Sequence, residues 1–123
     1  MVEVRAYLRK AQEYLAAASD CLAAGRLDAA TSAAIHAGIN AADAICGARS
    51  GVRSSSPNHA RTIDLLESAG PDGVDGARQL RKLLPLKNLA EYDYAATTRQ
   101  RATTALRAAL AIVDIARRVA AAP

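Results

Sequence analysis

The sequence predicts an all-α fold, a bundle of five antiparallel helices, and its composition is the first reason for this prediction. Of the 123 residues 31 are Ala, whereas the aromatic residues are four Tyr with no Phe and no Trp. Ala is the best helix former, while strands depend on β-branched and aromatic side chains. The composition therefore argues against a β-sandwich or barrel, and the length leads us to expect one domain over residues 1–123.

The second reason is the spacing of apolar residues, which follows the helical period in five successive stretches. The first helix is predicted from Val4 to Leu22, because its apolar residues are alternately four and three apart. Gly25 follows it, as expected of a residue just beyond a helix end. The second helix is predicted to begin near Asp28, a favourable N-cap, and to continue to about Arg49.

A short third helix is predicted from His59 to Ala69, with Asn58 as its N-cap. It follows a Ser-rich segment that is the longest irregular piece of the sequence. Gly70-Pro71 is expected to end this helix, because Gly and Pro in succession are typical of a turn.

The fourth helix is predicted to begin after Asp72 and to contain Pro85. Proline removes one backbone donor, but apolar spacing resumes beyond it, so we expect a kink rather than a break. The fifth helix is predicted to open with a capping box from Thr97 to Gln100 and to run to about Ala121.

Charge and hydropathy limit the classes of function. The net charge of +4 and the pI of about 9.4 favour anionic partners only weakly. No apolar run reaches the roughly 18 residues of a membrane span. Charged residues also interrupt the N-terminal segment where a signal peptide would have its apolar core. Cys21 and Cys46 lie inside helical patterns without metal-ligand spacing, so both are predicted to be buried thiols. We expect a cytoplasmic protein without a zinc site or a membrane segment.

The second predicted helix is almost free of charge, which makes its polar residues conspicuous. His36, Asn40 and Asp43 are spaced four and three apart and so share one stripe of the helix. Two interpretations are open: a hydrogen-bonded polar seam between helices, or a binding site that faces a dimer cleft. We expect a dimer, because each Ala in the core buries little area and a monomer of this size is marginal.

Two further segments carry candidate binding residues. Arg53 precedes the third predicted helix and His59 lies in its first turn, which suits either an anion site or a flexible solvated turn. On the fourth helix Lys87 and Glu91 form an (i, i+4) pair, followed by Tyr92. The residues from Lys87 to Tyr94 contain two of the four tyrosines, and the simplest interpretation is a salt-bridged helix end with packed Tyr side chains.

In chain order these features resemble the HEPN domain family, small helical bundles common in prokaryotes, and the resemblance covers nearly the whole chain. It implies an up-down helical topology. It rests on the opening helix with Ala11, Tyr14 and Ala18, on His36-Ala37 and Ala41-Ala42-Asp43-Ala44, on Gly51-Val52-Arg53-Ser54 with His59, on Leu83-Leu84, and on Lys87-x-x-Ala90-Glu91-Tyr92-Asp93, which is similar to the family's Arg-x-x-Ala-Asp/Glu-Tyr signature.

The resemblance also bears on catalysis. Ribonuclease members of the family carry an Arg and, four to six residues later, a His on the penultimate helix, and two copies meet in a dimer cleft. Here Lys87 and Tyr92 stand in those places, and Tyr with a pKa near 10 is a poor general base at neutral pH. Arg53 and His59 fit the interval, but they precede the third helix. Other members are partners of nucleotidyltransferases in toxin–antitoxin-like pairs or are proposed to bind nucleotides.

The leading hypothesis is a homodimeric, HEPN-like module that binds a nucleotide, an RNA or a partner protein without catalysis and without a cofactor. In it Arg53 and Lys87 contact phosphate, while the histidines and Tyr92 form hydrogen bonds or stack. The alternatives are a metal-independent endoribonuclease with His59 or His36 as its base, and a purely structural interaction module whose partner is encoded nearby. The candidate site residues are His36, Asp43, Arg53, His59, Lys87, Glu91 and Tyr92.

Overall fold

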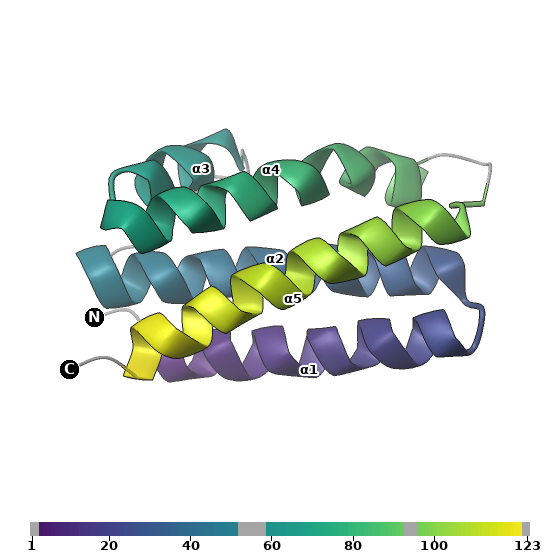
Figure 1. Cartoon of the computed structure of the whole chain (residues 1–123), viewed down its shortest axis with the longest axis horizontal. Helices are drawn as coiled ribbons and strands as arrows, with labels where there is room; N and C mark the ends of the chain where they lie inside the picture. The colour runs from purple at the N-terminus through teal and green to yellow at the C-terminus, as the bar shows by residue number, and fades with distance from the viewer. Residues whose placement is uncertain (1–2, 52–58, 93–95, 122–123) are drawn as a thin grey trace.

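The computed structural model describes residues 3–51, 59–92 and 96–121, with the side chains of residues 88–92 left out. This part of the chain contains five helices and no strand, so the expected all-α fold is confirmed. The four long helices run up and down, each antiparallel to the long helix before it (Figure 1). The helices are α1 (Val4–Ala23), α2 (Leu27–Ser50), α3 (Ala60–Glu67), α4 (Gly70–Tyr92) and α5 (Arg99–Ala121).

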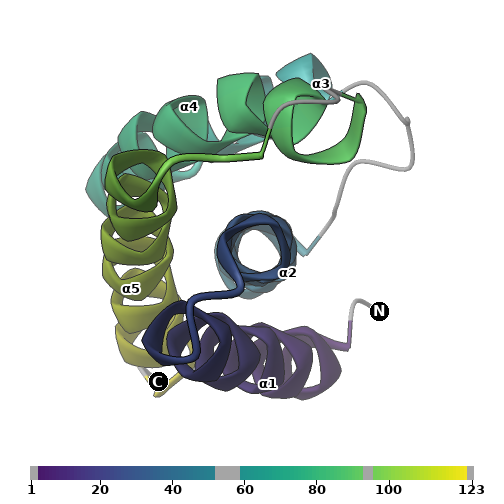
Figure 2. The same cartoon turned by 90° about the vertical axis from the view of Figure 1, so that its right-hand side faces the viewer.

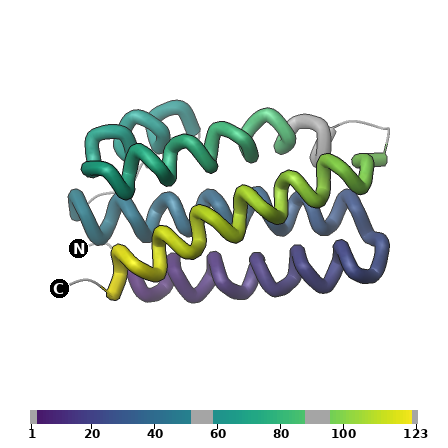
Figure 3. Tube along the Cα trace, in the orientation of Figure 1, coloured from purple at the N-terminus to yellow at the C-terminus, as the bar shows by residue number. Residues whose placement is uncertain are grey.

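The second helix lies at the centre of the bundle. Figure 2 shows α1, α5 and α4 on three sides of α2, and all three contact it. The fifth helix crosses the bundle obliquely, from α4 at its start to α1 at its end (Figure 3). The short α3 packs mainly on α4 and also contacts α2. Because α2 contacts all four other helices, its sequence bears most directly on the core.

Small residues let the helices approach α2 closely. The buried side chains of α2 are mostly Ala, and Gly38 lies where α4 is nearest. A Cβ atom on Gly38 would lie 2.3 Å from Cδ1 of Leu83, a side chain that is itself fully buried. The contact between α2 and α4 therefore depends on a residue without a side chain.

No described helix covers the fourth side of α2 in Figure 2. Between Ala30 and Cys46 most residues of α2 are buried, and the half-buried ones must point to this fourth side. We call them the exposed stripe of α2: Ser32, Ala33, His36, Ile39 and Asn40.

The turn between α1 and α2 is a Schellman motif centred on Gly25. Gly25 has a φ of +76° and donates to the carbonyl of Leu22 at 3.1 Å, while Arg26 donates to the carbonyl of Cys21 at 2.9 Å. The positive φ suits glycine because it has no Cβ atom. The predicted end of the first helix is confirmed, and the turn fixes the register of α1 against α2.

Two predicted helix caps, Asp28 and Thr97, are wrong, and the two residues bind each other instead. Asp28 does not cap α2, which begins one residue earlier; its Oδ1 instead accepts a 2.7 Å hydrogen bond from the backbone N–H of Thr97. The cap of α5 is Thr98 and not Thr97, since the Thr98 hydroxyl accepts from the N–H of Arg101 at 3.2 Å. Thr97 is thus held by α2, and the capping position moves one residue along the chain.

The Gly70-Pro71 pair opens α4 instead of serving as the break before it. Gly70 has a φ of +85°, and Pro71 sits in the first turn, where a helix needs no backbone donor. Further along, α4 continues through Pro85, so the prediction that this proline does not break the helix is confirmed. The predicted cap Asn58 lies outside the described residues.

Exposed ion pairs join the helix ends. Arg49 at the end of α2 binds the carboxylate of Asp72 at the start of α4 at 2.7 Å, and Arg81 of α4 pairs with Glu67 of α3. Pairs this exposed each contribute about 1 kcal/mol or less. Within the described ranges no helix is both long and apolar enough to cross a membrane.

Candidate functional site

The seven predicted site residues fall into two groups. Three cannot be placed, because Arg53 lies outside the described residues and the side chains of Glu91 and Tyr92 are left out. The predicted pair of Lys87 and Glu91 is therefore not tested. The side chains that the structure places are His36 and Asp43 on α2, His59 at the start of α3, and Lys87 on α4.

The polar stripe of α2 runs from the surface into the core. His36 and Asn40 are half-buried members of the exposed stripe, whereas Asp43 is only 8 % exposed. The Asn40 side-chain amide donates to the backbone carbonyl of His36 at 2.9 Å, which fixes the orientation of the amide. Every buried polar side-chain atom that the structure describes has a hydrogen-bond partner. The seam interpretation thus fits Asp43, and the accessible-site interpretation fits His36 and Asn40.

The ring of His36 contacts a tyrosine from the first helix. The ring centroids of His36 and Tyr14 are 5.3 Å apart and the planes are tilted by 31°. Tyr14 is nevertheless 40 % exposed, one of the few large apolar side chains at the surface. An aromatic pair of this geometry stabilises the contact between α1 and α2 by about 1 kcal/mol. Part of the Tyr14 ring remains available to a further planar group.

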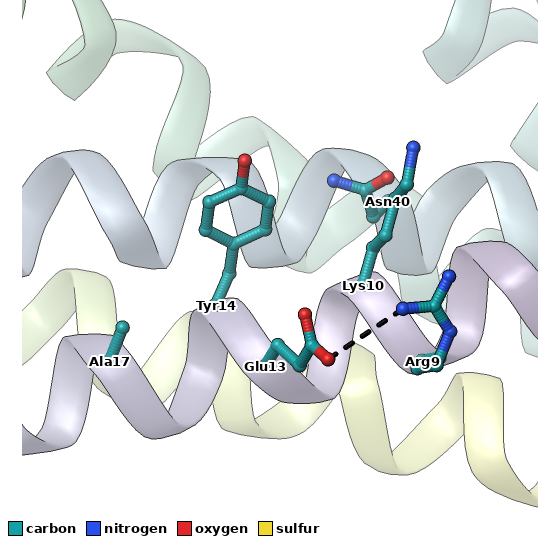
Figure 4. Close-up of a pocket in the computed structure, with 6 residues that line it drawn as sticks. All are labelled: Arg9, Lys10, Glu13, Tyr14, Ala17 and Asn40. Carbon is teal, nitrogen blue, oxygen red and sulfur yellow. Dashed lines mark ion pairs between the residues drawn. The ribbon is translucent and has the colours of Figure 1, made fainter.

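An open groove lies beside this ring pair, between α1 and α2. Its volume is about 490 Å³, and Figure 4 shows Lys10 and Tyr14 extending from α1 toward Asn40 of α2. Arg9 forms a 3.6 Å ion pair with Glu13, while Lys10 makes no ion pair with any other described residue. The groove is lined by Arg9, Lys10, Glu13, Tyr14, Ala17 and Asn40.

Sequence reasoning did not include Tyr14 or Lys10 among the site residues, although a signal for them exists. Tyr14 and His36 each lie eleven residues from Gly25, and Lys10 and Asn40 each lie fifteen residues from it. In an antiparallel helix pair, residues at equal distances from the turn lie at the same level. Counting outward from Gly25 is therefore enough to pair these residues across the two helices.

The other two residues that the structure places belong to α3 and α4. His59 is half-buried at the N-terminus of α3, and Lys87 is half-buried in the second half of α4. No ion pair joins Lys87 to any side chain that the structure places, and its predicted partner Glu91 is not among those side chains. A separate depression of about 430 Å³ between α4 and α5 does not include Lys87; it is lined by Lys82, Leu86, Thr98, Gln100, Arg101 and Thr104.

Cys46, the cysteine of α2, is not a reactive nucleophile at neutral pH. Burial raises the pKa of Cys46 to about 11, and the nearby charge of Asp43 adds to the effect. The thiol therefore stays protonated at neutral pH, where only the thiolate would react. Cys21 is a free thiol that is only partly buried, which corrects the prediction that both cysteines are buried. Among the described residues, no three His, Cys, Asp or Glu side chains are grouped to hold a metal ion.

Comparison with protein families decides the assignment. The family model of the HEPN domain matches residues 4–119, almost the whole sequence. The chain belongs to the HEPN domain family. No curated protein matches it. The resemblance drawn from the sequence is therefore confirmed, and it places this HEPN domain in a family of nucleotide- and RNA-related modules whose members often dimerise.

The resemblance drawn from the sequence implies that Lys87 and Tyr92 stand where ribonuclease members of the HEPN family carry Arg and His. Both residues fall inside the matched range. Lysine keeps the positive charge that a phosphate requires, whereas tyrosine does not supply a base at neutral pH.

Proposed function

We propose that this HEPN protein is a non-catalytic module that binds a nucleotide or RNA and works as a homodimer. The observation that carries the proposal is the exposed stripe of α2, which places His36 and Asn40 at the surface on the side that no described helix covers. Lys87 on α4 adds a half-buried cation. Phosphate oxygens are the acceptors that such cationic and donor groups bind.

The packing of α2 supports the dimer. Its core side chains are mainly Ala, and each of them buries less apolar area than a Leu or Ile would. The exposed stripe also holds Ile39, an apolar side chain that is only partly covered. A second copy of the chain packed against Ile39 would bury this side chain and add the area that the Ala-rich core lacks, with His36 and Asn40 facing the cleft between the two copies.

Two residues support the non-catalytic part of the proposal. Tyr92 stands where a ribonuclease has its His, and Cys46 is protonated at neutral pH. A metal-independent endoribonuclease that uses His36 or His59 instead is tested by incubating the protein with mixed RNA in EDTA. We expect the RNA to stay intact. Cleavage that disappears in the His36→Ala or His59→Ala variant would overturn the non-catalytic assignment.

Binding is tested by calorimetric titration of AMP and of a short 5′-phosphorylated RNA into the wild type and two lysine variants. Lys87→Ala should weaken RNA binding about fivefold or more, because it removes the positive charge assigned to the phosphate contact. Lys82→Ala is the matched control, since it removes the same charge from an exposed position of the same helix. Equal affinities in the two variants would contradict the assigned role of Lys87.

The dimer is tested by sedimentation of the wild type and of an Ile39→Glu variant. We expect a dimer that becomes a monomer when a charge is placed on the exposed stripe. A wild-type monomer at all accessible concentrations would contradict the dimer. A protein that binds neither AMP nor RNA, but forms a stable complex with a nucleotidyltransferase encoded beside it, would instead support an interaction module in a toxin–antitoxin-like pair.

A further inference from the structure

We propose that the groove between α1 and α2 beside Tyr14 is a subsite for a single nucleoside phosphate, either a free mononucleotide or the end of an RNA strand. The inference rests on the proposed binding function and assigns it residues outside the seven predicted from the sequence. Its core is the combination of a stacking surface, a cation and a fixed amide within one groove: Tyr14, Lys10 and Asn40.

The first requirement is a surface on which a base can stack. Tyr14 contacts His36 at 5.3 Å and still exposes 40 % of its surface, and it lines the groove. Because His36 supports the ring from α2, the ring is held in place before a ligand arrives. Stacking of a base on an aromatic side chain is sequence-tolerant and strong enough to anchor a single nucleotide.

The second requirement is a group that reads the base edge. The Asn40 amide nitrogen donates to the His36 carbonyl at 2.9 Å, so the amide cannot rotate freely. This bond leaves the amide oxygen as an oriented acceptor in the groove, on the side of Lys10 in Figure 4, where an exocyclic amine of a base can donate to it. Figure 4 shows the amide in the same groove as Tyr14 and Lys10.

The third requirement is positive charge for the phosphate. Lys10 has no ion-pair partner among the described residues, while the charge of Arg9 is shared with Glu13 at 3.6 Å. The groove therefore contains two cations and one carboxylate, and its least neutralised cation is Lys10. The phosphate is expected at Lys10 and away from Glu13.

The size of the groove agrees with one nucleotide. Its volume of about 490 Å³ lies within the range of roughly 300–1,000 Å³ typical of small-molecule sites. The depression between α4 and α5 has a similar volume and also carries Lys82 and Arg101, but its lining contains no aromatic side chain. Of these two depressions, only the one beside Tyr14 offers a stacking surface together with charge.

The test is calorimetric titration of AMP, adenosine, inorganic phosphate and a 5′-phosphorylated RNA hexamer into the full chain. AMP should bind about tenfold more tightly than adenosine or phosphate alone, because stacking and charge act together. Tyr14→Ala should lower AMP affinity about tenfold, and Tyr14→Phe should retain it, since the ring and not the hydroxyl stacks. Equal AMP affinity in wild type and Tyr14→Ala would overturn the subsite.

Charge variants give a second readout that loss of folding cannot imitate. Lys10→Ala should lower AMP affinity about threefold and flatten its salt dependence, while Glu13→Gln should raise the affinity about twofold by removing a repulsive charge. Lys82→Ala is the matched control with no expected change. A Glu13→Gln variant with unchanged or lower affinity would contradict the placement of the phosphate.

The outcomes separate this subsite from the proposed function. If Lys87→Ala weakens RNA binding while Tyr14→Ala and Lys10→Ala do not, the binding module stands and the groove is excluded. If none of the ligands binds, both fall. If Tyr14→Ala converts a dimer into a monomer without changing AMP affinity, this surface is a subunit interface and the inference is wrong. If AMP binds as tightly as the RNA hexamer, the ligand of the groove is a free nucleotide. If the hexamer binds more tightly, the ligand is the end of an RNA strand.

Discussion

The packed and exposed sides of α2 use the same helix for opposite purposes. The buried side chains of the helix are mostly Ala, and Gly38 faces Leu83 of α4 and Ile112 of α5, so neighbouring backbones come close. On its exposed stripe it presents His36, Ile39 and Asn40, none of which is fully covered. The difference teaches that α2 packs against its neighbours mainly through small residues, while His36 and Asn40 lie on the side that no described helix covers.

The largest expected effect compares two isoleucines one turn apart. Ile35→Ala should lower the free energy of unfolding by about 3 kcal/mol, because it leaves a cavity in a fully buried position. Ile39→Ala, on the exposed stripe, should cost about 1 kcal/mol. Urea denaturation measures both values. Equal losses in dilute protein would show that the two positions are packed alike.

Adding volume should sharpen the same comparison. Gly38→Ala should destabilise the protein by about 1–2 kcal/mol, since the new methyl group would meet the buried Leu83 and outweigh the gain in helix propensity. Ser32→Ala on the exposed stripe should be neutral or slightly stabilising, because only the propensity gain remains. Thermal unfolding followed by circular dichroism distinguishes them. A Gly38→Ala protein as stable as the wild type would mean that Leu83 moves aside freely.

The smallest expected effect is a pH dependence on the packed side. Burial raises the pKa of Cys46 to about 11 from its ordinary value of 9.0. The folded state therefore holds its proton more tightly than the unfolded state. The stability from this group is complete below about pH 9 and is lost as the pH rises through about 11. Denaturation at pH 8, 9.5 and 10.5 should show a steeper decline for the wild type than for Cys46→Ala.

The difference between the two variants in how stability falls with pH separates the effect of Cys46 from that of tyrosines and lysines, which titrate in the same pH range. Identical slopes would mean that the Cys46 thiol is not desolvated. In the same native protein, a thiol reagent at pH 8 should label the partly buried Cys21 and leave Cys46 unmodified.

The fold could be predicted from the sequence wherever the signal is local. The apolar spacing, the glycine at position 25 and the resumption of apolar residues after Pro85 each depend on a few neighbouring residues, and all three predictions agree with the structure. The errors arise where one residue type suits two partners. Asp28 can cap its own helix or bind a distant backbone N–H, and only the meeting of α2 with the segment before α5 favours Thr97.

The site was predictable only in part for a related reason. The four-and-three spacing of the polar residues on α2 identifies the stripe, but it cannot say that Asp43 is covered while His36 stays half-exposed. That difference depends on which other helices lie above each residue. In the sequence Tyr14 contributes only to the family resemblance, because its contact with His36 joins two helices and has no signature within either one.

The Schellman turn at Gly25 fixes which residues of α1 and α2 face each other across the groove. With so short a connection, an inserted residue cannot be absorbed in a loop and would instead shift α1 along its axis by about 1.5 Å and rotate it by about 100°. Tyr14 would then swing away from His36 and Lys10 from Asn40 in a single step. An insertion or deletion between residues 23 and 27 should therefore disturb the protein more than one in most other surface segments.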